Sequence, residues 1–78
     1  MKNYVTFGQV HVHEVSGITF DRNCVATYES NTKEDGRNFA FSVFGDKFCF
    51  HYVDQCPDLS YFPRGLVEVV LPEERTTQ

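Results

Sequence analysis

The sequence predicts an α+β domain in which a mostly antiparallel four-stranded sheet carries one helix on one face, in the order ββαββ. Only residues 31–45 show the spacing of an amphipathic helix, and four other stretches show the composition and alternation of strands. A chain of 78 residues is also the size of a single domain. We expect residues 1–71 to form this domain and residues 72–78, which are polar and charged, to be a flexible C-terminal tail.

The predicted helix has an apolar face and a signal at each end. The apolar residues recur at i, i+3, i+4, i+7 and i+8, on one side of a helix: Gly36, Phe39, Ala40, Val43 and Phe44. Asn31 can cap the N-terminus through its side-chain oxygen, and Glu34 lies where it can bond back to the cap. Gly45 follows the last apolar residue, as a left-handed C-terminal cap requires. A helix of about three turns is marginal alone in water, so this face must pack on the sheet.

The first strand is predicted over residues 3–15. Val10 and Val12 point to one side of this strand, and a kink at Gly8 would bring the earlier apolar residues to the same side. The valines therefore form one of the surfaces on which we expect the helix to pack.

The remaining strands follow from composition and alternation. The Ser-Gly pair at 16–17 predicts a turn, and residues 24–29 are rich in strand-forming side chains. Residues 47–53 alternate most cleanly, residues 54–65 contain turn-forming residues typical of a loop, and residues 66–71 are a last strand. The residues that share the aromatic face of the alternating stretch are Phe48, Phe50 and Tyr52. We expect the helix to pack on this face and on the valines.

The composition disfavours several classes of function. The net charge is −4 and the seven basic residues are scattered, which argues against a protein that follows a phosphate backbone. No apolar run is long enough to cross a bilayer, and residues 1–15 lack the apolar core of a secretory signal. Three cysteines without framework spacing indicate reduced thiols. We therefore expect a cytoplasmic protein without a membrane or nucleic-acid partner.

Two short motifs place metal-ligating residues on one face of their strands. They are His11-x-His13 and Cys49-x-His51, in which the paired side chains point the same way. If the two strands were neighbours in register, four nitrogen and sulfur donors would converge as in a structural zinc site. Another of the cysteines could replace one of the four. The alternative interpretation is two solvated histidines on an exposed face and a packed free cysteine.

The same residues could also form a Cys–His nucleophile pair. However, a small domain with one helix offers little room for a catalytic cleft. The sequence contains no phosphate-binding glycine loop, nucleophile elbow or H-E-x-x-H motif. We therefore expect a protein that is not an enzyme and that has no cofactor, with zinc as the exception if the metal site forms.

The segment 54–65 is the best candidate for a binding surface. It contains two prolines, which limit the entropy lost on binding, and residue types found at interface hot spots. The candidate partner-binding residues are Leu59, Tyr61, Phe62 and Arg64. We expect Tyr61 and Arg64 to be exposed, at a partner interface or at a homodimer contact. Alternatively, Leu59 and Phe62 tuck beneath the edge of the sheet as part of the core.

Several segments, in their order along the chain, resemble small proteins encoded by bacteriophages and prophages. They are YVTFGQVHVH near the start, an acidic helix start, FGDKFCFHY and YFPRG, over roughly residues 4–65. The resemblance implies an accessory protein that binds and blocks a host factor, and inhibitors of bacterial defence systems such as CRISPR are a class of this size. It supplies no functional residues for this chain.

We therefore predict a non-enzymatic, phage-type interaction protein that binds and inhibits a bacterial host protein in the host cytoplasm. A defence component of the CRISPR type is one such protein. The alternative is a small zinc-stabilised structural module. A nucleic-acid-directed protein is a third hypothesis, which the negative charge disfavours.

Overall fold

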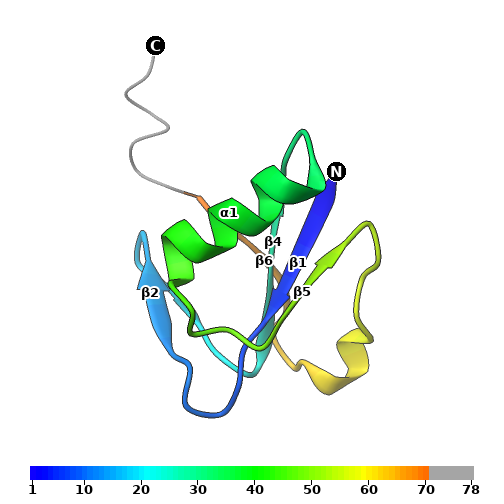
Figure 1. Ribbon diagram of the computed structural model, residues 1–78. Coiled ribbons are helices and arrows are strands. Elements are labelled where there is room, and N and C mark those ends of the chain that lie inside the picture. The colour runs from blue at the N-terminus through cyan, green and yellow to red at the C-terminus, as the bar shows by residue number, and fades with distance from the viewer. Residues whose placement is uncertain (71–78) are drawn as a thin grey trace.

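The computed structural model describes residues 1–70, which form an α+β fold with one helix and a mixed four-stranded sheet (Figure 1). The elements are β1 (Lys2–Thr6), β2 (His13–Val15), β3 (Ile18–Phe20), β4 (Cys24–Glu29), α1 (Lys33–Phe44), β5 (Phe50–Val53), a 3₁₀ turn η1 (Leu59–Tyr61) and β6 (Gly65–Glu68). The predicted tail 72–78 and the end of the predicted last strand at Leu71 lie outside the described residues. Within residues 1–70, no helix has the length and apolar character needed to span a bilayer.

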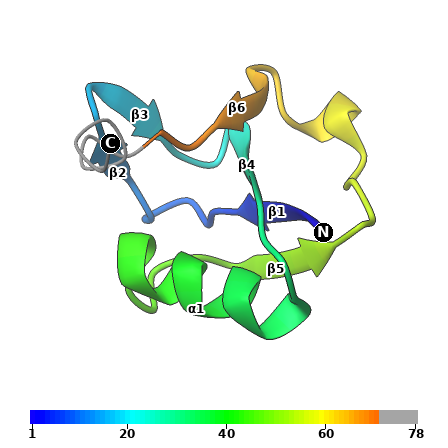
Figure 2. The ribbon, with the colours of Figure 1, turned by 90° about the horizontal axis from the view of Figure 1, so that it is seen from above.

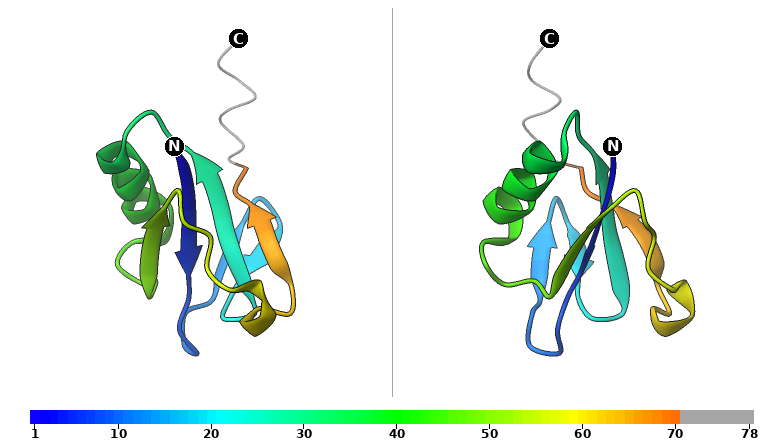
Figure 3. Two further views of the ribbon diagram at one scale, coloured as in Figure 1. Left: turned by 90° about the vertical axis from the view of Figure 1, so that its right-hand side faces the viewer. Right: turned by 45° about the vertical axis from the view of Figure 1, so that its right-hand side comes forward.

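The sheet has the strand order β5-β1-β4-β6, and β2 pairs with β3 in a separate hairpin. Strand β1 is antiparallel to both β4 and β5, whereas β6 is parallel to β4. The α+β class with a single helix is therefore confirmed for the described part of the chain, but the sheet is mixed and the order ββαββ does not match. The connection from β5 to β6 crosses from one edge of the sheet to the other (Figure 3). It returns to the end at which β4 begins, where the Arg64 N–H donates to the Asn23 carbonyl, so β6 runs parallel to β4.

The predicted strand 3–15 is two strands, because the chain turns at Gly8. The Gly8 carbonyl accepts from the His11 N–H at 3.1 Å, and the Gly8 N–H donates to His11 Nδ1 at 3.2 Å. Val10 and Val12 lie on this turn and are 87% and 64% exposed. The predicted packing of the helix on a valine face is therefore wrong, because these side chains have left the sheet.

Helix α1 is capped at both ends, but the sequence predicted only the C-terminal cap correctly. Thr32, not Asn31, is the N-cap, and its side-chain oxygen accepts from the Asp35 N–H at 3.0 Å. Gly45 is the C-terminal cap, with a φ of +65° that favours glycine, and its N–H donates to the Phe41 carbonyl at 2.9 Å. The predicted apolar face is confirmed, since its members are buried (Gly36, Ala40, Phe44) or half-buried (Phe39, Val43).

Phe44 lies at the centre of the aromatic core. Its ring meets those of Phe7, His13 and Phe20 at centroid distances of 4.9, 5.1 and 5.7 Å, in edge-to-face arrangements that aromatic pairs favour. These rings come from the end of β1 and from the hairpin β2-β3. Figure 2 shows this hairpin on the side of the molecule where α1 ends. The hairpin therefore completes the core beneath the last turn of the helix.

The start of α1 packs closely on β1 through Gly36 and Asn3. Asn3 is fully buried, and its Nδ2 donates to the Tyr28 carbonyl at 3.3 Å and to Ser30 Oγ at 2.9 Å. Its Oδ1 accepts from His51 Nε2 at 2.7 Å. A Cβ added to Gly36 would overlap the Asn3 side chain, 2.6 Å from its Cγ. Glycine is therefore the residue that permits the helix to approach the sheet here.

The side chains of residues 47–53 do not alternate regularly between the two faces of the sheet, because the chain bends at Cys49 before β5 begins. Phe48, before the bend, packs against α1. Phe50 and Tyr52, after the bend, pair with β1 residues that point away from α1, and directly opposite residues share a face. The predicted aromatic face is therefore wrong, because its members are divided between the two sides of the sheet.

The segment 54–65 passes over the sheet face that α1 leaves uncovered (Figure 3). Thr6, Val25 and Thr27 point to this face, and only 6%, 0% and 7% of their surface is exposed. The side of the sheet opposite the helix is thus partly covered by this connection.

Candidate functional site

The four residues of the predicted zinc site do not come together. His11 lies on the turn after β1, and His13 lies in the hairpin, with its Nε2 2.8 Å from the Lys47 carbonyl. A carbonyl only accepts, so this nitrogen is the protonated donor. His51 lies in β5, where its Nε2 donates to Asn3. Among residues 1–70, no three His, Cys, Asp or Glu side chains are grouped so that they could hold a metal ion.

Of the four predicted zinc ligands, Cys49 and His11 both lie close to Gly8. A Cβ built on Gly8 would lie 3.2 Å from Cys49 Sγ and 3.5 Å from His11 Nδ1. A catalytic Cys–His pair needs an imidazole nitrogen that can take the thiol proton. The lone pair of His11 Nδ1 already accepts the Gly8 N–H. This nitrogen therefore does not activate the thiol, and the absence of enzymatic activity stays a prediction.

The side of the sheet opposite α1 carries an aromatic surface around a pocket of about 480 Å³. We define this aromatic surface as Phe50 and Tyr52 of β5 with Tyr61 and Phe62 of the segment 54–65, all of which line the pocket. Phe50 and Tyr61 are 61% and 77% exposed, whereas Tyr52 and Phe62 are half-buried. The strand and the connection thus contribute equally to one patch of aromatic side chains.

The four predicted partner-binding residues are held in different ways. Tyr61 is largely exposed, as expected, and Phe62 is half-buried beside it in the pocket wall. Leu59 is 37% exposed and does not line the pocket. Arg64 is exposed, as expected, but its guanidinium lies 3.4 Å from the Asp21 carboxylate. Arg64 therefore ties the segment to the turn before β4, and the aromatic residues remain as the candidate contacts.

Asp58 fixes the turn that presents Tyr61. Its Oδ1 accepts from the Ser60 N–H at 3.0 Å, and its carbonyl accepts from the Tyr61 N–H at 3.3 Å. The hydrogen bonds from Ser60 lower the pKa of the Asp58 carboxyl group, which therefore stays charged at neutral pH. Tyr61 is thus held on an ordered turn rather than on a free loop.

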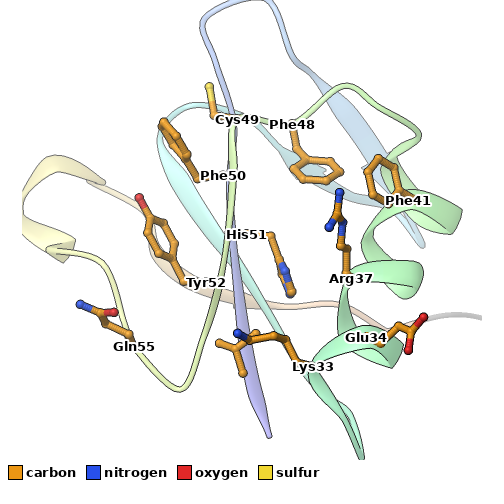
Figure 4. Close-up of a pocket in the computed structure, with 11 residues that line it drawn as sticks. Lys33, Glu34, Arg37, Phe41, Phe48, Cys49, Phe50, His51, Tyr52 and Gln55 are labelled. Atoms are coloured by element: carbon orange, nitrogen blue, oxygen red, sulfur yellow. The ribbon is translucent and has the colours of Figure 1, made fainter.

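A second hollow, of about 790 Å³, lies between α1 and β5 (Figure 4). We call it the basic groove and define it by Lys33, Arg37 and Phe41 of α1 with Phe48 and His51 of the β5 segment. The Arg37 guanidinium lies 5.5 Å from the centre of the Phe41 ring, and Figure 4 shows it directed toward Phe48 and Phe41, with His51 to one side. Desolvation, and then the charges of Arg37 and Lys33, lower the pKa of His51. The imidazole is therefore neutral at neutral pH, and the charged residues of the groove are Lys33, Arg37 and Glu34, all on the helix.

Two parts of these sites were not predicted from the sequence. Phe50 was expected beneath the helix, and only the bend at Cys49 turns it to the open side. Lys33 and Arg37 are among the basic residues that appear scattered along the sequence. Their i, i+4 spacing, which is unfavourable for like charges on a helix, was the signal that could have identified them.

Comparison with protein-family models, with curated proteins and with solved structures finds no match for this chain. Its function is therefore inferred from the chemistry and geometry of these two surfaces.

Proposed function

We propose that this chain is a non-enzymatic interaction protein that binds another protein through the aromatic surface. The observation that supports the proposal is that Phe50 and Tyr61, which are 61% and 77% exposed, line one pocket. Large apolar side chains grouped on the surface of a small protein commonly mark a contact site. Aromatic side chains are enriched at such sites and contribute much of the binding free energy.

The scaffold holds these side chains in place before a partner binds. Phe50 and Tyr52 belong to a strand that is paired with β1, and Tyr61 ends a capped turn between Pro57 and Pro63. Ordered groups lose less conformational entropy on binding than groups on a free loop. The pocket beside them can receive an anchoring side chain of the partner, which is the usual arrangement of a hot spot.

The kind of partner is proposed from the resemblance to phage-encoded proteins. That resemblance points to a bacterial host protein in the cytoplasm, and a component of a CRISPR-type defence system belongs to this class. Occupation of a contact surface on such a protein would inhibit it. A second copy of this chain is the competing occupant, and the experiment below distinguishes the two.

Replacing Phe50 and Tyr61 together by alanine should weaken partner binding by at least about 2 kcal/mol, or about 30-fold, because hot-spot losses exceed ordinary surface effects. The intact protein serves as bait in a bacterial lysate, and a binding curve with the purified partner then compares the wild type with the double variant. The thermal midpoint should stay close to that of the wild type, since both side chains are mostly exposed.

The matched control replaces Val10 and Val12 by alanine. These side chains are also apolar and exposed, but they lie on the turn around Gly8, away from the pocket. We expect the control to bind as the wild type does. Equal affinities of the wild type and the Phe50/Tyr61 variant would contradict the proposal, as would equal losses in both double variants. Self-association that rises with protein concentration and is lost in the Phe50/Tyr61 variant would make a second copy the occupant.

A further inference from the structure

Strand β5 is an edge of the sheet with one open side. In the order β5-β1-β4-β6 it pairs, among residues 1–70, only with β1. Figure 4 looks onto β5 with β1 behind it, α1 on one side and the segment 54–65 on the other. Residues Phe50–Val53 include no proline or lysine, which are residues that commonly block pairing at an edge. The edge is therefore open to a further strand.

Two residues of β5 direct their backbone groups to the open side. Along an antiparallel strand, residues alternate between those bonded to the neighbouring strand and those that face away from it. The Asp54 N–H donates to the Lys2 carbonyl at 2.7 Å. Tyr52 lies two residues before Asp54, so its backbone groups also face β1. The N–H and C=O groups of His51 and Val53 thus face outward, where a further strand could bond to them.

The side chains of β5 point alternately to the two hollows. His51 points to the basic groove, whereas Phe50 and Tyr52 belong to the aromatic surface on the other side (Figure 4). Phe50 and Tyr52, together with Cys49 and Gln55, also border both hollows, so the two hollows adjoin along β5. A strand added at this edge would continue the alternation, so its side chains would enter the two hollows in turn.

The charged side chains that line the basic groove are the cations Lys33 and Arg37 and one carboxylate, Glu34. Lys33 and Arg37 take part in no salt bridge within residues 1–70. They lie about one helical turn apart, in a chain whose net charge is −4. Figure 4 shows Lys33 extended toward β5 and Glu34 turned away from it. A carboxylate that entered the groove would therefore meet two cations.

We propose that β5 binds an extended, acidic segment of the protein partner by strand addition. The segment pairs with the outward backbone groups of His51 and Val53. Its carboxylates contact Lys33 and Arg37, and its alternate apolar side chains contact the aromatic surface. This inference rests on the proposed function, because it specifies the chemistry of the partner bound at that surface.

A second copy of the chain fits this edge less well than an acidic segment. If β5 of another copy paired with β5, it would offer residues Phe50–Val53 to the basic groove. These four residues include no carboxylate, so Lys33 and Arg37 would remain unpaired. Charge complementarity therefore selects a partner segment that contains aspartate or glutamate at alternate positions.

The test uses the full chain and two synthetic peptides of identical composition. In the first peptide glutamate alternates with phenylalanine or valine, and in the second the acidic and apolar residues form separate blocks. The alternating peptide should shift the amide NMR signals of His51 and Val53 in a saturable way and slow the hydrogen exchange of these amides. The block peptide should bind at least about tenfold more weakly, because it cannot place both kinds of side chain in register.

Variants of the protein and of the peptide then distinguish the contribution of charge to binding from the contribution of backbone pairing. Arg37→Glu should weaken binding of the alternating peptide at least about tenfold. Arg22→Glu makes the same charge change at an exposed residue before β4 and should alter binding by less than about twofold. Methylation of the peptide nitrogens that face β5 should abolish the shifts at His51 and Val53, and it leaves the fold of the protein unchanged.

The outcomes distinguish this inference from the proposed function. Binding of the alternating peptide with the His51 and Val53 amides unshifted would overturn strand addition. Unchanged binding by Arg37→Glu would overturn the acidic preference, and failure of the wild type to bind either peptide would overturn both. Shifts at the same amides on raising the protein concentration alone would assign the edge to a second copy. None of these results alters the proposed function, which depends on the recovered partner and the Phe50/Tyr61 variant.

Discussion

Replacing Phe44 by alanine should lower the free energy of unfolding by about 3–5 kcal/mol, the usual cost of truncating a buried aromatic side chain. Phe44 is 2% exposed, and its ring contacts Phe7, His13 and Phe20. Truncation would leave a cavity where α1, the end of β1 and the hairpin β2-β3 meet. A domain of 78 residues has a total stability of roughly 4–12 kcal/mol, so this loss would remove a large share of it.

The matched control for this prediction is Phe41→Ala. Phe41 belongs to the same helix and is the same residue type, but it is 42% exposed and lies outside the buried core. Denaturant unfolding of both variants should show a much smaller loss for Phe41→Ala than for Phe44→Ala. An unchanged unfolding midpoint for Phe44→Ala would show that the helix packs on the sheet through a different face.

Gly36→Ala should destabilise the protein by about 2–3 kcal/mol, even though alanine favours a helix over glycine by about 1 kcal/mol. The added methyl group meets the side chain of Asn3, which is held by hydrogen bonds with Tyr28, Ser30 and His51. Relief of the overlap would move either the helix or the amide. A displaced amide would leave buried polar groups without partners, which adds to the loss.

A double-mutant cycle tests this contact directly. In an Asn3→Ala background, Gly36→Ala should cost nothing or should stabilise the protein, because the overlapping atoms are gone. Asn38→Ala, on the exposed side of α1, should be neutral or slightly stabilising and serves as the control for helix propensity. A single Gly36→Ala variant as stable as the wild type would contradict the close approach of α1 to β1.

Local interactions explain the parts of the fold that the sequence predicted well. The apolar face from Gly36 to Phe44 follows from a 3.6-residue period, and the cap at Gly45 requires a positive φ that glycine adopts readily. The turn at Ser16 and Gly17 has positive φ at both residues, as a two-residue hairpin requires. Each of these features depends on residues close together in the chain.

The features that were not predicted depend on contacts between distant segments. The first strand ends at Thr6, and the chain turns at Gly8 toward the hairpin β2-β3. The bend at Cys49 reverses the side to which the following residues point. A shift of one residue exchanges the two faces of a strand, so alternation alone could not place Phe50. The pairing of β6 depends on how the segment 54–65 crosses the sheet, which no local pattern determines.

In the candidate surfaces, too, the sequence predicted the features that depend on nearby residues and missed those that depend on distant segments. The exposure of Tyr61 follows from its position on a short turn among prolines, and it was predicted. Phe50 and Tyr61 line one pocket only because β5 and the segment 54–65 meet on the same face of the sheet. The basic groove likewise requires α1 to pass beside the edge strand, which brings Arg37 opposite His51 (Figure 4).

The most direct measurement of partner binding at the aromatic surface is photo-crosslinking from position 61 in living bacteria. A photoreactive phenylalanine analogue replaces Tyr61 in one strain and Val10 in another, since both side chains are exposed, by 77% and 87%. We expect a discrete adduct with a host protein from position 61 and no such adduct from position 10. Adducts from position 10 alone, or the same diffuse set of adducts from both positions, would contradict a binding surface at Tyr61.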